Sequence, residues 1–209
     1  MGQIKVKGII ISENNMNDFD KMVTILTPNG KIGCSAKGAR KSKSLLLAGT
    51  QFLCFGEYLL FKGNDTYPMN SCETIEVFYN IRNDLDKLMK AAEITKIVND
   101  VTDENQNTYN ILKLFLNTLY VISEKEKDLD LVCAIFKIRL MKILGFSPEI
   151  DKCVNCNEKE NLNFFSFKDN GFKCDNCYKI DKSVFNMSEG TKKSIIYAMK
   201  ADIKKIFNI

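Results

Sequence analysis

Residues 20–38, DKMVTILTPNGKIGCSAKG, predict a β-hairpin. Two runs rich in Val, Ile and Thr, the residue types that favour strands, flank the sequence Pro28-Asn29-Gly30. This tripeptide is a turn signal, because glycine supplies the positive φ that a tight hairpin needs. The second run then alternates, so that Ile32 and Cys34 face one side and lysines face the other.

Three further segments with strand character lie around this hairpin in the first eighty residues. The five predicted strands are 3–13, 20–27, 31–38, 52–62 and 66–78. We expect a small closed barrel, because an open sheet of five short antiparallel strands would leave unpaired edge strands that could pair with other chains. The fourth strand is apolar in both alternating sets, which predicts cover on each face and hence a barrel packed against the helical segment that follows.

From Asn83 onward the apolar period becomes 3.6, which indicates helices. The first predicted helix begins after a cap at Asn83/Asp84 and carries an apolar stripe that includes Leu85, Met89 and Ala92. Two more helices are predicted at 109–123 and 129–144. A last helix begins at Ser188 and Glu189 and extends to Ile203 and Ile206. Gly145 suits a helix C-cap, and Pro148 stops any continuation. The predicted fold is therefore α+β and multi-domain: a barrel (1–80), a helical domain (81–150), a cysteine-rich finger (151–180) and a C-terminal helix packed on the helical domain (181–209).

The composition excludes several classes of chemistry. None of the 209 residues is histidine, so Ser-His-Asp and Cys-His catalytic pairs are ruled out, and a metal site would have to use Cys, Asp or Glu. The sequence contains neither an apolar stretch of the ~20 residues a membrane helix needs nor an N-terminal signal peptide, so we expect a cytoplasmic protein without membrane contact. The net charge of +4 is too small to predict a nucleic-acid partner by itself.

Four of the eight cysteines form two Cys-x-x-Cys pairs, Cys153/Cys156 and Cys174/Cys177. This spacing is typical of a four-thiolate zinc site, and we interpret it as structural because four thiolates leave no open coordination position. A phenylalanine-rich hairpin turning at Asp169-Asn170-Gly171 would bring the pairs together. A thiol-disulfide redox pair is the rival interpretation, but it would require a strand-helix-strand context that is missing here. The other cysteines, Cys34, Cys54, Cys72 and Cys133, are predicted to fill the core.

A run of positive charge follows the third predicted strand. Between Asp20 and Glu57 there are six cations and no acidic residue, and four of the cations, Lys37, Arg40, Lys41 and Lys43, lie in one loop. Such a run is often only a solvated surface, but a loop extending from an oligonucleotide-binding type of barrel favours nucleic-acid binding. Gly33-x4-Gly38 begins like a nucleotide-binding loop but continues with Ala39-Arg40, which gives ATP hydrolysis no support. Phe19 and Tyr67 are candidates either for stacking on bases or for the core.

Several further segments occur in a characteristic order along the chain: Val6-Lys7-Gly8-Ile9-Ile10, Leu26-Thr27-Pro28, Gly30-Lys31, Ala36-Lys37-Gly38-Ala39-Arg40-Lys41, and the segment from Phe136 to Pro148 immediately before Cys153. In these segments and their order the chain resembles the RecO family of bacterial recombination mediators. The resemblance implies an N-terminal OB-fold barrel, a helical domain and an inserted zinc finger.

The resemblance also implies function. Such a protein would bind single- and double-stranded DNA, anneal complementary strands and, with RecR, help the recombinase RecA to displace single-strand binding protein, in the bacterial cytoplasm at the nucleoid. We therefore predict a DNA-binding protein that is not an enzyme, with Lys37, Arg40, Lys41 and Lys43 contacting phosphates and Lys5, Lys7 and Lys31 supporting them. One structural Zn²⁺ would be bound by Cys153, Cys156, Cys174 and Cys177. The alternative is a zinc-containing protein-interaction scaffold without a direct role on DNA.

Overall fold

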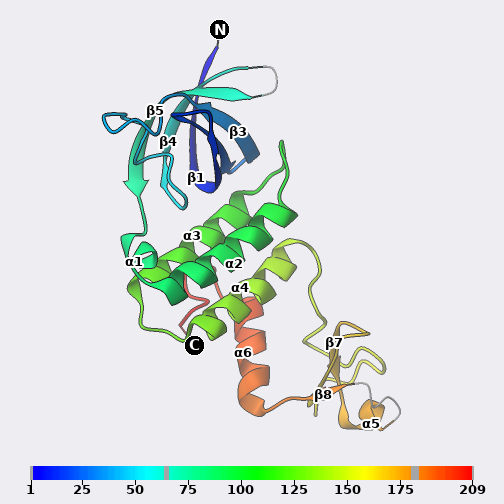
Figure 1. The fold of residues 1–209 in the computed structure, drawn as a ribbon. Coiled ribbons are helices and arrows are strands. Elements are labelled where there is room, and N and C mark those ends of the chain that lie inside the picture. Colours follow the sequence, from blue (N-terminus) through cyan, green and yellow to red (C-terminus); the bar gives the residue numbers. More distant parts are fainter. Residues whose placement is uncertain (1, 64–65, 180–183, 209) are drawn as a thin grey trace. The chain divides into compact units, whose positions relative to one another are not determined.

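The computed structural model describes residues 2–63, 66–179 and 184–208 (Figure 1). The chain divides into two compact units, Met1–Asp130 and Leu131–Ile209. The first unit contains the strands of the barrel and the helices that follow them, and the second contains the cysteine-rich segment.

The barrel is built from β1 (Gln3–Met16), β2 (Asp20–Thr27), β3 (Gly30–Ala36), β4 (Phe55–Phe61) and β5 (Tyr67–Glu76). These strands close in the order β1-β2-β3-β5-β4, and every pair is antiparallel except β3 with β5. The predicted five-stranded, OB-like barrel is therefore confirmed. Two details differ from expectation: β1 continues three residues beyond Glu13, and the β3–β5 pair is parallel although antiparallel strands were predicted.

The barrel interior is a continuous apolar core. Its buried members include Ile10, Val23, Ile25, Tyr58 and Leu60. Cys34 and Cys54 belong to this core, and burial raises the pKa of Cys34 to about 12, so these cysteines fill space as predicted. The expectation that β4 is covered on both faces was wrong in part. Tyr58 and Leu60 are fully buried, whereas the residues that alternate with them are only half-buried.

Three helices complete the first unit: α1 (Tyr79–Arg82), α2 (Leu85–Val101) and α3 (Tyr109–Glu124). The predicted cap of α2 is confirmed, because the Asp84 side chain accepts a hydrogen bond from the backbone N–H of Lys87 at 3.1 Å. The predicted apolar stripe was wrong in part: Leu85 and Met89 are 72% and 57% exposed, and the buried face carries Ala91 and Ile94. Leu88 and Ile97, which also belong to the predicted stripe, are half-buried. Apolar residues lie on two sides of α2, and tertiary packing selects the side with the smaller residues.

The β2–β3 turn joins the barrel to these helices. Gly30 has a φ of 106°, and a Cβ atom there would lie 2.6 Å from the carbonyl oxygen of Asp103, so only glycine fits. The Gly30 N–H donates to Thr108 Oγ1 at 3.0 Å, and the Thr108 N–H donates to the Pro28 carbonyl at 2.9 Å. The barrel and the first helices are therefore packed together, as expected, through this turn and through Arg82 of α1, which donates to the Phe52 carbonyl at 2.7 Å.

The second unit combines helices with a small sheet. Helix α4 (Leu129–Ile143) is followed by Gly145, whose φ of 87° matches the predicted capping glycine. The sheet has the order β7 (Gly171–Lys173), β6 (Phe164–Ser166) and β8 (Phe185–Asn186), with α5 (Asp175–Tyr178) following β7. In the part of the chain that the structure describes, no helix is both long and apolar enough to cross a membrane.

The last helix, α6 (Glu189–Lys200), begins as predicted and ends too early. Ser188 Oγ accepts from the backbone N–H of Thr191 at 3.1 Å, which confirms the N-cap. Ile203 and Ile206 lie beyond the helix, contrary to our prediction. Arg139 and Lys142 of α4 both donate to the carbonyl oxygen of Met199 and so cap the last turn of α6. The backbone leaves the helical conformation at Ala201, whose ψ is 155°.

Candidate functional site

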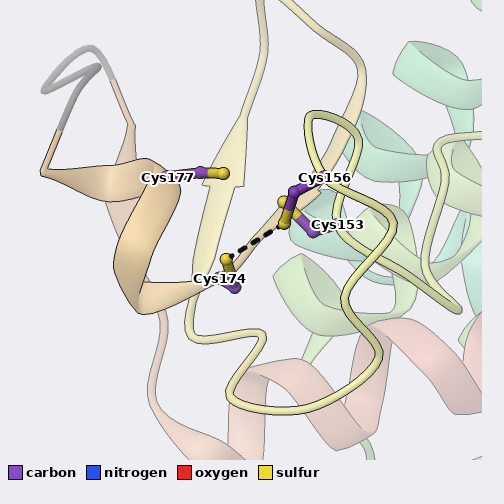
Figure 2. Close-up of side chains that lie close together, drawn as sticks. All are labelled: Cys153, Cys156, Cys174 and Cys177. Atoms are coloured by element: carbon purple, nitrogen blue, oxygen red, sulfur yellow. Dashed lines mark hydrogen bonds between the residues drawn. The ribbon is translucent and has the colours of Figure 1, made fainter.

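The four predicted metal ligands converge in the second unit (Figure 2). Cys153 and Cys156 lie in the loop after α4, Cys174 directly precedes α5, and Cys177 lies within α5. All four sulfur atoms are within 4.8 Å of one another, and every cysteine is a free thiol. The Sγ atoms of Cys156 and Cys174 are 3.6 Å apart.

This arrangement fits one tetrahedral metal ion. With Zn–S bonds of about 2.3 Å, two sulfurs of a tetrahedral site would lie about 3.8 Å apart. Burial acts to raise the pKa of Cys153, but backbone N–H groups, including those of Cys174 and Cys156, donate to its sulfur and lower the pKa to about 6. Burial raises the pKa of Cys177 to about 12, so the thiols of the cluster are not all shifted in the same direction. The convergence of the four sulfur atoms, and not one lowered pKa, is what allows these cysteines to hold a metal ion.

The cysteines also belong to the small core of this segment. Cys153, Cys174 and Cys177 are buried together with Ile150, Leu162, Phe172 and Met199. The predicted hairpin is present, with Phe165 paired to Phe172 and Asn170 at a φ of 50° in the turn. Lys173 is buried and its Nζ lies 2.6 Å from a carboxylate oxygen of Asp169, whose pKa is lowered by this hydrogen bond. The cysteines therefore make up a large part of the buried core of this segment.

The second candidate site lies in the first unit, at residues 37–44, which we call the basic loop. The loop is tied to the turn between β1 and β2, residues 17–19. Asp20 accepts from the Gly38 N–H at 2.7 Å, and the Arg40 N–H donates to the Phe19 carbonyl at 2.9 Å. The Arg40 guanidinium also donates to the carbonyl oxygens of Asn17 and Asp18, at 3.3 and 3.2 Å. The loop and the turn are therefore one hydrogen-bonded element.

The predicted cations of the basic loop are exposed, but they differ in their contacts. Lys37 and Lys43 make no hydrogen bond or ion pair with any residue that the structure describes. The Nζ of Lys41 lies 5.7 Å from the centre of the Phe19 ring. Three lysines are thus available to an anion, while Arg40 uses its guanidinium to hold the loop.

The three lysines predicted to support the loop lie elsewhere. Lys31 is at the opposite end of β3, where its Nζ donates to the Asn99 carbonyl of α2 at 2.9 Å. Lys5 forms an ion pair with Glu57, and this hydrogen bond raises the pKa of Lys5 and lowers that of Glu57. Lys7 lies 5.5 Å from the ring centre of Phe55. Lys7 is separated from the turn by ten residues, or about 30 Å measured along the strand.

Reasoning from sequence missed the residues that position the basic loop. Asp20 and the carbonyl groups of Asn17 and Asp18 act through hydrogen bonds to distant residues, which a count of charges does not reveal. The polar run from Asn14 to Asp18 was the available signal, since Asn and Asp favour turns and tolerate positive φ. Asn17 indeed has a φ of 47°.

Comparison with known proteins assigns the two parts of the chain to the same family. Residues 1–78 match the family model for the N-terminal part of recombination protein O, and residues 82–209 match that for its C-terminal part. The chain is 42% identical over 210 residues to a DNA repair protein RecO of Acetivibrio thermocellus, covering all of this chain and 84% of the relative. It is 34% identical to the RecO protein of Alkaliphilus metalliredigens, over 97% of this chain and 83% of the relative. The chain therefore belongs to the RecO family of DNA repair and recombination proteins.

Proposed function

We propose that this chain binds single- and double-stranded DNA through the basic loop and anneals complementary strands without making or breaking covalent bonds. The observation that carries the proposal is the set of three exposed lysines, Lys37, Lys41 and Lys43, on a loop fixed by hydrogen bonds at one end of an OB-like barrel. Barrels of this kind bind oligonucleotides with their strands and connecting loops. Membership of a DNA repair family supports the same assignment.

Annealing follows from electrostatics in this proposal. Each DNA strand is a dense line of negative charge, and lysines that bind phosphate release condensed counterions. A surface that binds both strands lowers their mutual repulsion, so that base pairing can nucleate. Phosphate contacts carry no base information, so the activity would be independent of sequence. The proposal keeps four other predicted cations as weaker contributors, because each already has a partner within the protein: Arg40, Lys5, Lys7 and Lys31. Among the described residues, the Arg40 side chain holds the loop through one guanidinium nitrogen only, and it is exposed.

The wider role is proposed from the family. The chain would act with RecR to help RecA displace single-strand binding protein from DNA, in the cytoplasm at the nucleoid. We also propose that the four cysteines bind one structural Zn²⁺, because four thiolates at tetrahedral spacing suit this ion and leave no position open for catalysis. The division into a barrel (1–80), helical domain (81–150), zinc finger (151–180) and C-terminal helix (181–209) stays part of this proposal.

Strand annealing tests the proposed function. We would replace Lys37, Lys41 and Lys43 together by alanine and compare a control in which the exposed Lys159, Lys204 and Lys205 are replaced. Both variants lose the same amount of positive charge, but only the first loses it from the basic loop. We expect the first variant to anneal complementary oligonucleotides much more slowly and the control to resemble the parent protein. Equal annealing by both variants would contradict the assignment of DNA binding to the loop.

A protein-interaction scaffold is the second candidate function. It is favoured by an apolar cavity of about 430 Å³ in the second unit, lined by residues that include Ile138, Met141, Phe165 and Phe185. A scaffold without a direct role on DNA would not bind a simple polyanion such as heparin, whereas the proposed DNA-binding protein would. Heparin affinity at low salt therefore separates the two candidates.

A further inference from the structure

We propose that Phe19 is a base-stacking residue that makes the basic loop prefer unpaired DNA over duplex. This inference rests on the proposed DNA-binding function and assigns the form of DNA that the same site recognises. Phe19 lies between β1 and β2, in the turn that is hydrogen-bonded to the basic loop. In OB folds the loop between the first two strands is one of the two that contact oligonucleotides.

The exposure of Phe19 separates it from the other aromatic candidate. Phe19 is 50% exposed, although a phenylalanine side chain gains free energy from burial. Tyr67, which the sequence offered equally, is half-buried and packs against the barrel core. The ring of Phe19 is therefore not a core residue, and it is accessible to a ligand.

The surroundings of Phe19 combine a ring with cations. An open hollow of about 390 Å³ is lined by Phe19, Lys37 and Lys41, and also by Asp18 and Asp20. The Asp20 carboxylate already accepts from the Gly38 N–H, so it serves to hold the loop. Lys41 Nζ is 5.7 Å from the ring centre, and Lys37 belongs to the same hollow. A base stacked on this ring would place its own phosphates beside these lysines.

The element is also held in place before any ligand arrives. The Phe19 carbonyl accepts from the Arg40 N–H at 2.9 Å, and the carboxylate of Asp20 accepts from Gly38 at 2.7 Å. These bonds fix the backbone on both sides of the ring relative to the basic loop. Stacking and phosphate binding would therefore act on one stretch of strand, at a small cost in ordering the protein.

Stacking on Phe19 would discriminate between forms of DNA. Every base has a π-face, so an aromatic residue binds unpaired bases with little regard to sequence. Bases inside a duplex are already stacked on their neighbours and cannot reach the ring. Phosphates are present in both forms, so the lysines alone would bind both. Phe19 is then the residue that adds affinity only for single strands.

The test compares Phe19→Ala and Phe19→Tyr on three probes: a single-stranded oligothymidylate, an abasic oligonucleotide of the same length, and a duplex. We expect Phe19→Ala to weaken oligothymidylate binding by roughly 5-fold or more, as for loss of one stacked base, and to leave abasic and duplex binding unchanged. Phe19→Tyr should bind like the parent protein because it keeps the ring. Tyr79→Ala, which removes another exposed ring of the same unit, is the matched control and should change nothing.

The possible outcomes separate a failure of the stacking role from a failure of the proposed DNA-binding function. Equal weakening of all three probes by Phe19→Ala would mean that the ring only positions Lys41, which overturns the stacking role and leaves phosphate binding by the loop intact. Unchanged oligothymidylate binding would also overturn the stacking role. Failure of the parent protein to bind any of the probes would overturn the proposed function and this inference with it.

Discussion

The basic loop and the four-cysteine cluster are held in place by different means. The loop is anchored by hydrogen bonds to a closed barrel that has its own apolar core. The cysteine cluster lies in a segment whose strands have only three, three and two residues, and three of its cysteines are themselves part of the core. A site on a barrel can therefore lose its functional side chains and keep its shape, whereas the cysteine segment depends on its functional side chains for its shape.

Replacing one metal ligand is expected to have the largest effect. Cys174→Ser should abolish binding of about one zinc per chain and locally unfold residues 151–179, because metal binding supplies much of the folding free energy of such small segments. Metal analysis and amide hydrogen exchange measure the two effects. Cys133→Ser, which changes a buried cysteine outside the cluster, is the control and should keep its metal. Full metal content in Cys174→Ser would contradict the site, and loss of protection in the barrel would contradict the contrast between the regions.

The joint between barrel and helices should respond next most strongly. Thr108→Val leaves the buried N–H of Gly30 without its acceptor and should lower the free energy of unfolding by about 1 to 3 kcal/mol. Thr118→Val is a matched control, since Thr118 is equally buried but donates to the Leu114 carbonyl of its own helix. Its effect should be smaller, because that carbonyl remains part of the helix. Urea denaturation compares the two, and equal losses would show that the joint contributes nothing beyond burial.

Replacing single lysines, one in β3 and one in the adjoining basic loop, should give the smallest changes in stability and DNA affinity, in opposite patterns. Lys31→Ala removes the hydrogen bond to Asn99 and should lower the free energy of unfolding by about 1 kcal/mol, with little change in DNA affinity. Lys37→Ala should do the reverse, because Lys37 is exposed and lies in the basic loop. Thermal melts and DNA titrations on both variants check the reversal. DNA affinity that fell equally in both would contradict the rank of Lys31 as a weaker contributor than Lys37.

The sequence predicted the cysteine cluster residue by residue because ligand spacing is a local constraint. Two Cys-x-x-Cys turns can present four sulfurs to one ion whatever the rest of the fold does. The basic loop was predicted only as a run of charge. Whether a lysine is available depends on partners far along the chain, such as Glu57 for Lys5 and Asn99 for Lys31, and periodicity carries no information about them.

The fold shows the same division between local and distant causes. The bounds of β2 and the caps of α2 and α6 were predicted because turn and cap residues act on their immediate neighbours. The end of α6 was not predicted, because the residues that cap its last turn, Arg139 and Lys142, lie on another helix. The buried face of α2 was also missed in part, since both of its apolar sides satisfy the helical period.

The salt dependence of DNA binding tests the central claim most directly. If Lys37, Lys41 and Lys43 each contact one phosphate, replacing all three by alanine should make the slope of log affinity against log salt for single-stranded DNA shallower by roughly two, from about 0.7 per contact. The Lys159/Lys204/Lys205 triple variant should keep the slope of the parent protein. An unchanged slope in a folded basic-loop variant would contradict the claim, because it would show that the three lysines are solvated and do not bind DNA.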